Sequence, residues 1–204
     1  MTESDITDLV DEQTRAVIQW RQAKEEDRPY EGTNEIVPFR DFVECGLAIP
    51  TSDFFRTLLK YWGIQLHHLT PQSILHLSIF THLCEAFLGV EPHFHLFQHF
   101  FYLRRHPSAS KPIEVGGAKL ALCPESQGEY LFYQPSRKGV EWKNFWFYVE
   151  NHQPSLPEWA HGAPKDKGCW TSPSPRGDQV QKREYILASG IMVLMTYHVS
   201  HQRN

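Results

Sequence analysis

The chain has 204 residues, of which 41% are hydrophobic and 13% aromatic, and its formal net charge is −4. This length is typical of one domain that buries a core without disulfides or metals, and so high an aromatic content is unlike a disordered chain. The net acidity argues against a wholesale nucleic-acid binder, because such proteins are usually basic.

The four cysteines are too widely spaced for a zinc motif, and none forms a CxxC pair. Cys45 and Cys84 lie in apolar sequence, where a free cysteine behaves as a small buried hydrophobe. We therefore expect an intracellular protein with reduced thiols. The N-terminus is acidic and polar, so it has no secretory signal pattern.

Residues 1–34 are expected to form an N-terminal arm. Apolar residues recur in them with a broken helical period, which predicts a peripheral helix over roughly residues 4–27 that ends before Pro29.

The next segment predicts two short helices. One spans residues 40–44 and stops at Gly46. The other follows the capping residues Thr51, Ser52 and Asp53, runs along the sequence FFRTLLKYW and stops at Gly63.

The stretch 66–101 has the densest apolar content and seven of the twelve histidines. Thr70 is a good N-cap and Pro71 a favoured first helical residue, so we expect a helix over 71–88 that stops at Gly89. Its apolar residues cover most of the circumference, which predicts the most buried helix of the fold. A second helix is expected from Pro92 to about residue 106.

From residue 113 the pattern changes from helix to strand. The runs 113–122, broken by Gly116 and Gly117, 128–133 and 141–149 read as strands of a small antiparallel sheet. The expected fold is therefore α+β, with a helical half over about 36–106 followed by a sheet over about 113–149.

The C-terminal part divides into two segments. Residues 151–180 are rich in Pro, Gly, Ser and charge, and are predicted to be a disordered linker whose residues Trp159 and Trp170 could dock on the domain. Residues 181–204 are expected to form a helix with an apolar segment, 185–199. Fifteen helical residues span about 22 Å, short of the ~30 Å hydrocarbon core, so we expect a docking helix and not a membrane span.

Several histidines are candidate metal ligands. His95 and His99 have the i, i+4 spacing that can hold one metal ion, with His93, His76 and His82 nearby in sequence. No HExxH motif is present and no third ligand is fixed by spacing, so we interpret these histidines as packing and surface residues. We predict no metal and no cofactor.

No catalytic residue can be named from the sequence. The acids are scattered, whereas nuclease and integrase chemistry needs a cluster of them around a metal. Asp53 is explained by a helix cap, and Glu85 is expected to be buried with a partner such as Arg104 or Lys60. Nucleophile-elbow and phosphate-loop motifs are lacking. We therefore expect a protein that is not an enzyme and has no evident small-molecule substrate.

The aromatic run 142–149 (WKNFWFYV) permits two interpretations. A core strand is the first. The second is a platform that stacks single-stranded bases, with Lys143 beside it. The net acidity of the chain favours the core strand.

Several motifs resemble one family of domains, the plant "putative transposase, gypsy type" family. Residues 46–55 match its G[FL].[LI]P.S.FF motif, and residues 66–74 match L.HLTPN.I with Gln72 in place of Asn. Residues 80–94 match F..LCEAFLGI.PHF, and residues 142–149 match the later W...WFYV pattern.

The resemblance assigns residues 35–150 to this gypsy-type domain. It implies a non-catalytic, gag-like or accessory part of a retrotransposon-derived protein that acts in protein–protein assembly, including self-association. The alternative is a nucleic-acid-binding module of the transposition machinery. From Lys182 onward the chain departs from its relatives, which continue into a longer polar helix.

Overall fold

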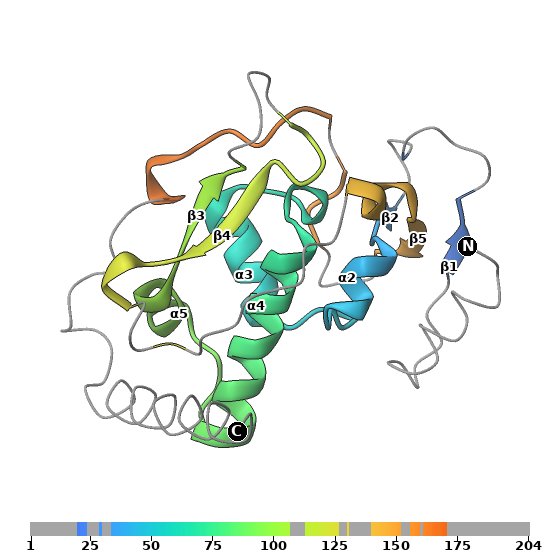
Figure 1. Ribbon diagram of the computed structural model, residues 1–204. Coiled ribbons are helices and arrows are strands. Elements are labelled where there is room, and N and C mark those ends of the chain that lie inside the picture. Colours follow the sequence, from blue (N-terminus) through green and yellow to red (C-terminus); the bar gives the residue numbers. More distant parts are fainter. Residues whose placement is uncertain are drawn as a thin grey trace, which may run out of the picture.

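The computed structural model describes residues 20–23, 29, 34–106, 113–126, 130, 140–151, 156–159 and 161–170. In this part of the chain α4 runs through the centre (Figure 1). The two-stranded sheet of β3 and β4 lies on one side of it, and α2 with the second sheet lies on the other. The α+β class predicted from the sequence is confirmed.

The described helices and strands, in chain order, have the following bounds: β1 (Trp20–Gln22), β2 (Glu35–Ile36), α2 (Arg40–Glu44), α3 (Asp53–Trp62), α4 (Pro71–His82), α5 (Phe94–Phe100), β3 (Phe101–Arg105), β4 (Ala118–Leu122) and β5 (Phe147–Glu150). Short 3₁₀ helices cover Leu66–His68, Pro124–Ser126, Val140–Asn144 and Gly168–Trp170, and a π-helix covers Leu83–Leu88.

Both predicted ends of α3 and the predicted start of α4 agree with the structure, because local capping residues mark them. Ser52 Oγ accepts a hydrogen bond from Phe55 N, and Gly63 ends α3 with a left-handed φ of 62°. Thr70 Oγ1 accepts one from Ser73 N, and Pro71 follows as the first helical residue.

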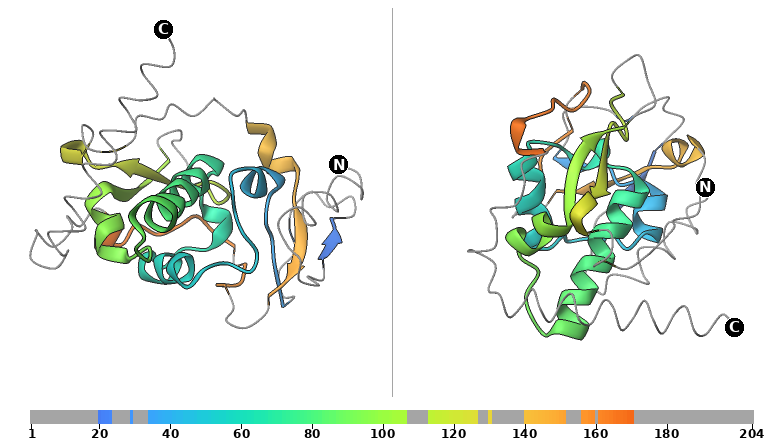
Figure 2. Two further views of the ribbon diagram at one scale, coloured as in Figure 1. Left: turned by 90° about the horizontal axis from the view of Figure 1, so that it is seen from below. Right: turned by 60° about the vertical axis from the view of Figure 1, so that its left-hand side comes forward.

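The end of the central helix differs from a regular α-helix. After His82 the chain continues as a π-helix and stops at Gly89, whose φ is 63°. This end extends away from the other described elements (Figure 2). Only Leu83 and Cys84 of the π-helix are buried, whereas Phe87 is 50% exposed. The last part of the helix predicted over 71–88 is therefore largely exposed, although its apolar residues predicted the most buried helix of the fold.

The helix predicted from Pro92 to residue 106 is shorter than expected. It ends at Phe100, and Phe101–Arg105 form β3 instead. Buried Phe101 and Leu103 alternate with more exposed neighbours, which is the two-residue period of a strand. β3 pairs antiparallel with β4, with Leu103 opposite Leu120.

The region around Gly116 also differs from the prediction. It forms a turn, but residues 113–117 are not a strand, so β4 has its partner in β3 and not in a local hairpin.

The second sheet has the order β1-β5-β2 and joins distant parts of the chain. β5 pairs antiparallel with both neighbours, with Val149 opposite Trp20 on one side and Ile36 on the other. The helix expected over residues 4–27 is therefore wrong at Trp20–Gln22, which form β1. Arg21 of β1 also donates two hydrogen bonds, of 2.8 and 2.7 Å, to the Glu35 carboxylate of β2, so the two outer strands are linked across β5.

The described part of the Pro-rich segment is packed on the core, so the expected disorder does not apply to residues 156–159 and 161–170. Trp170 is 1% exposed, and its Nε1 donates a hydrogen bond of 3.0 Å to Trp62 O. Leu156 is buried and is held by hydrogen bonds to the Asn151 side chain. The docking considered for Trp170 is therefore confirmed.

Other expected elements fall outside the described residues. They are the rest of the N-terminal helix, the strand 128–133 apart from Tyr130, and the helix 181–204. Within the described ranges, no helix is long and apolar enough to cross a membrane.

We predict that Trp170→Ala lowers the free energy of unfolding by about 3–5 kcal/mol, because it empties a buried indole site. Urea denaturation followed by circular dichroism measures this change. Asp166→Ala, on an exposed residue of the same segment, is the matched control and should stay within about 0.5 kcal/mol of the parent chain. Equal effects of the two substitutions would show that the segment does not stabilise the core.

Candidate functional site

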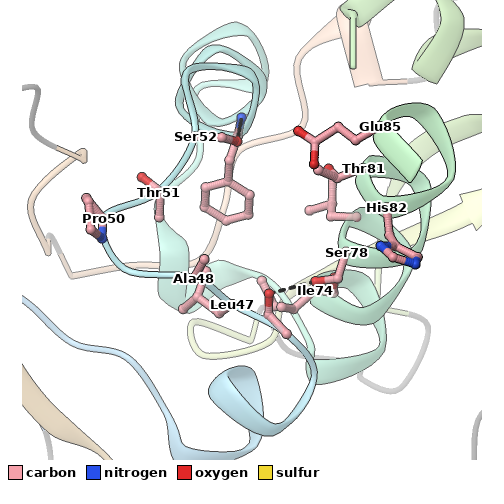
Figure 3. Close-up of a pocket in the computed structure, with 13 residues that line it drawn as sticks. Leu47, Ala48, Pro50, Thr51, Ser52, Ile74, Ser78, Thr81, His82 and Glu85 are labelled. Atoms are coloured by element: carbon pink, nitrogen blue, oxygen red, sulfur yellow. Dashed lines mark hydrogen bonds between the residues drawn. The ribbon is translucent and has the colours of Figure 1, made fainter. Parts of the chain in front are cut away.

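A pocket of about 350 Å³ lies between the loop that joins α2 to α3 and one side of α4. Figure 3 shows Thr51 and Ser52 on one wall, with Thr81 and Glu85 on the opposite wall. The apolar part of its lining comprises Leu47, Ala48, Pro50, Phe55, Ile74 and Leu77. The volume is within the range of sites that take a small molecule or a few side chains.

The loop wall is fixed to α4 by one close contact. Ser78 Oγ donates a hydrogen bond of 2.9 Å to Gly46 O, and it also lies 3.1 Å from Ile74 O in its own helix. Gly46 has a φ of 89°, and a Cβ at this position would lie 2.8 Å from Ser78 Oγ. Only glycine therefore suits the position, because it tolerates both the left-handed backbone and the close approach.

The polar groups of the loop wall are mostly used within the protein. Ser52 Oγ caps α3, and the Thr51 carbonyl accepts a hydrogen bond from the Arg56 guanidinium. Arg56 also pairs with Asp53 in the first turn of α3. These bonds order the wall, and they leave the pocket with apolar contact as its main means of binding.

The α4 wall supplies a carboxylate at the rim. Glu85 is exposed and lines the pocket, so the expectation that it is buried with Arg104 or Lys60 is wrong. Its place in the π-helix at the protruding end of α4 explains this exposure. His82 lines the same rim and meets the exposed ring of Phe87 edge-on, at 5.7 Å between ring centroids. An apolar floor thus adjoins an exposed aromatic ring and an acid.

The histidines considered as metal ligands have structural contacts. His93 Nδ1 accepts a hydrogen bond from Leu96 N and so caps α5. The ring of His76 lies 5.4 Å from that of Phe101, and burial lowers its pKa. His95 and His99 are both in α5. Among the described residues, no three His, Cys, Asp or Glu side chains lie close enough together to hold a metal ion.

Another pair of histidines, for which the sequence suggests no particular role, is buried and has lowered pKa values. His67 and His68 are buried, and the His67 ring stacks on Trp159 with 3.6 Å between centroids. His68 Nε2 lies 3.1 Å from Gly162 O, and its Nδ1 accepts a hydrogen bond from Gln65 N. Burial lowers the pKa of His67 to about 2 and also lowers that of His68.

These contacts assign a structural role to the pair. Both histidines hold the segment that contains Trp159 and Gly162 against the 3₁₀ helix Leu66–His68, which precedes α4. Nearby, His161 pairs with Glu114 at 3.1 Å. The contact between His68 and Gly162 has no signature in the sequence, because the two residues are 94 positions apart.

The aromatic run 142–149 belongs to the core. Trp142 packs against Phe39 with centroids 5.0 Å apart, and the side chains of Trp146, Phe147 and Tyr148 are buried. Their faces are therefore covered by protein, as expected of a core segment. The strand predicted over 141–149 is wrong before Phe147, because Val140–Asn144 form a 3₁₀ helix and β5 spans only Phe147–Glu150.

The described residues form an α+β protein with an apolar pocket beside an exposed aromatic ring. A family model described as "Putative gypsy type transposon" matches residues 36–105. The family recognised from the motifs is thus confirmed over this segment, and its name indicates a gypsy-type transposon-related protein. No curated protein and no solved structure matches the chain.

We predict that Gly46→Ala is more destabilising than Gly89→Ala. Both glycines have a left-handed φ, which costs an alanine about 1–2 kcal/mol. At Gly89 a Cβ meets nothing within 4 Å, whereas at Gly46 it also collides with Ser78. Chemical denaturation of the two variants measures the difference. Equal losses would mean that the loop moves away from α4 without cost.

We also predict that the protein loses stability as the pH falls below 6.5. The unfolded chain protonates His67 near its ordinary pKa of 6.5, whereas the folded protein keeps it neutral down to about pH 2. Acid therefore favours the unfolded state throughout this window. For His67 alone, the free energy of unfolding should drop by about 2 kcal/mol between pH 7 and pH 5.

His67→Phe provides the control for this pH dependence, because it keeps a ring to stack on Trp159 and does not titrate. Urea denaturation at pH 7 and pH 5 should show a smaller loss in this variant than in the parent chain. The buried neighbour His68 still titrates in both proteins. An unchanged loss in the variant would show that His67 is not responsible.

Proposed function

We propose that this chain is a non-catalytic, gag-like assembly module of a plant gypsy-type retrotransposon-derived protein, and that it self-associates. The exposure of Phe87 beside the pocket carries the proposal. Phe87 and Tyr61 are the exposed large apolar side chains of the described residues, at 50% and 39%. Tyr61 packs against Phe94, with 4.3 Å between ring centroids, whereas Phe87 lies on the protruding end of the central helix.

The surface around Phe87 has the features of a contact site. Its apolar part continues from the Phe87 ring through His82 into the pocket, and Glu85 lies at the rim. An exposed aromatic anchor next to an apolar hollow is the arrangement in which a few residues supply most of the binding energy of an interface. A second copy of the chain is the partner that the family relationship favours.

The alternative of a nucleic-acid-binding module has less support. The aromatic side chains that would stack bases are buried, as described for Trp142, Trp146 and Tyr148. Proteins of that class bind single strands through exposed aromatic faces in a basic groove. The net charge of −4 argues against such a basic groove.

We predict that the full chain self-associates in a concentration-dependent manner and that Phe87→Ser weakens the association. Loss of one buried phenylalanine at an interface removes about 1.5–3 kcal/mol, or roughly ten- to a hundredfold in the dissociation constant. Sedimentation velocity over a wide range of protein concentrations measures both effects.

Tyr61→Ser is the matched control, because it also removes an exposed aromatic ring. Tyr61 lies near the C-terminal end of α3, whereas the pocket adjoins the N-terminal end of that helix. The control should associate like the parent chain. A parent chain that remains strictly monomeric at high concentration overturns the proposed function.

A further inference from the structure

The pocket beside α4 lacks an evident partner within the described part of the chain, and its chemistry specifies what kind of segment suits it. The floor takes apolar side chains, which Leu47, Phe55 and Leu77 would contact. Exposed Glu85 at the rim favours a positive charge next to those side chains. A suitable occupant is therefore a chain segment in which basic residues adjoin an apolar run.

The chain itself contains such a segment. Lys182 and Arg183 directly precede the apolar segment 185–199, which reads YILASGIMVLMTYHV. An apolar run of this length gains free energy when it is removed from water. Its basic residues suit the acid at the rim, and its apolar residues suit the floor of the pocket.

The connection is long enough for the segment to reach the pocket of its own chain. Trp170 anchors the preceding segment at Trp62, the last residue of α3. The ten residues of α3 span ~15 Å, and the pocket adjoins the other end of this helix. Residues 171–181 can extend over roughly 36 Å. A short tether also raises the effective concentration of the segment at the pocket.

We propose that the pocket is the docking site of the chain's own C-terminal segment, with a few apolar side chains of residues 185–199 on the apolar floor and Lys182 and Arg183 facing Glu85. The docked segment covers the surface next to Phe87. It thereby limits self-association until it is released. The docking stands on the pocket alone, whereas this control of assembly rests on the proposed function.

Hydrogen exchange of the full chain tests the docking. Ile191→Asp places a charge in the apolar segment, and it should speed amide exchange in peptides that cover residues 46–52 and 78–87 roughly tenfold, because the docked segment then dissociates. Ser200→Asp adds the same charge outside the apolar segment and should leave those peptides unchanged. Peptides of β3 and β4 report whether the fold is intact in each variant.

Charge reversal tests the contact at the rim. Glu85→Lys should also speed exchange in these peptides, and the addition of Lys182→Glu and Arg183→Glu should restore the parent rates. Equal rates in the parent and Ile191→Asp chains overturn the docking. In the Phe87→Ser chain, in which the association is weakened, protection that increases with protein concentration also overturns it, because the segment then comes from another copy. If the parent and Ile191→Asp chains exchange equally in buffer and only the parent chain binds phosphatidylcholine vesicles, the segment belongs to a membrane and the docking is likewise overturned.

Sedimentation of the same variants separates the two proposals. If both hold, Ile191→Asp associates more strongly than the parent chain because the surface near Phe87 is uncovered. Faster exchange in a variant that stays monomeric at every concentration would leave the docking in place and remove self-association.

Discussion

Two serine hydroxyls attach the central helix to the structures on either side of it. Ser73 Oγ accepts a hydrogen bond of 3.0 Å from Leu120 N in β4, and Ser78 Oγ donates one to Gly46 O in the loop after α2. Ser73 is fully buried, and its hydroxyl also contacts that of Thr70, the N-cap of α4. The buried hydroxyl thus has partners, as a buried polar group requires. The position of α4 determines where both the β3–β4 sheet and the pocket wall lie.

The helices could be predicted from the sequence where their ends depend on neighbouring residues. Ser52, Gly63, Thr70 and Gly89 act within one turn of the helix that each of them starts or stops. The strands depend on distant partners. The apolar residues of β3 follow α5 without any residue that breaks a helix, so only the pairing with Leu120 and its neighbours makes them a strand. β1 is a strand because it pairs with β5, and its own sequence shows no such preference.

The candidate site could not be predicted for a related reason. Each of its residues has a local explanation, such as Ser52 as a helix cap or Glu85 as an acid in an apolar run, and these explanations hide the fact that they face one pocket. The walls meet because Ser78 approaches Gly46, two residues that are 32 positions apart. The buried histidines are a similar case, since the stacking of His67 on Trp159 has no signature in either segment. The family motif at residues 46–55 coincides with the loop wall, and it does not indicate what this wall binds.

The contact between Trp170 and Trp62 joins residues 108 positions apart, and it has a consequence for how the protein is made. Synthesis proceeds from the N-terminus, so the family segment 36–105 emerges before β4, β5 and Trp170 exist. During that interval β3 lacks its partner strand and Trp62 lacks its contact with Trp170. The unit of folding is therefore longer than the unit of sequence similarity. A gene fragment cut at the limits of the family match would encode a chain with an unpaired strand and an incomplete core.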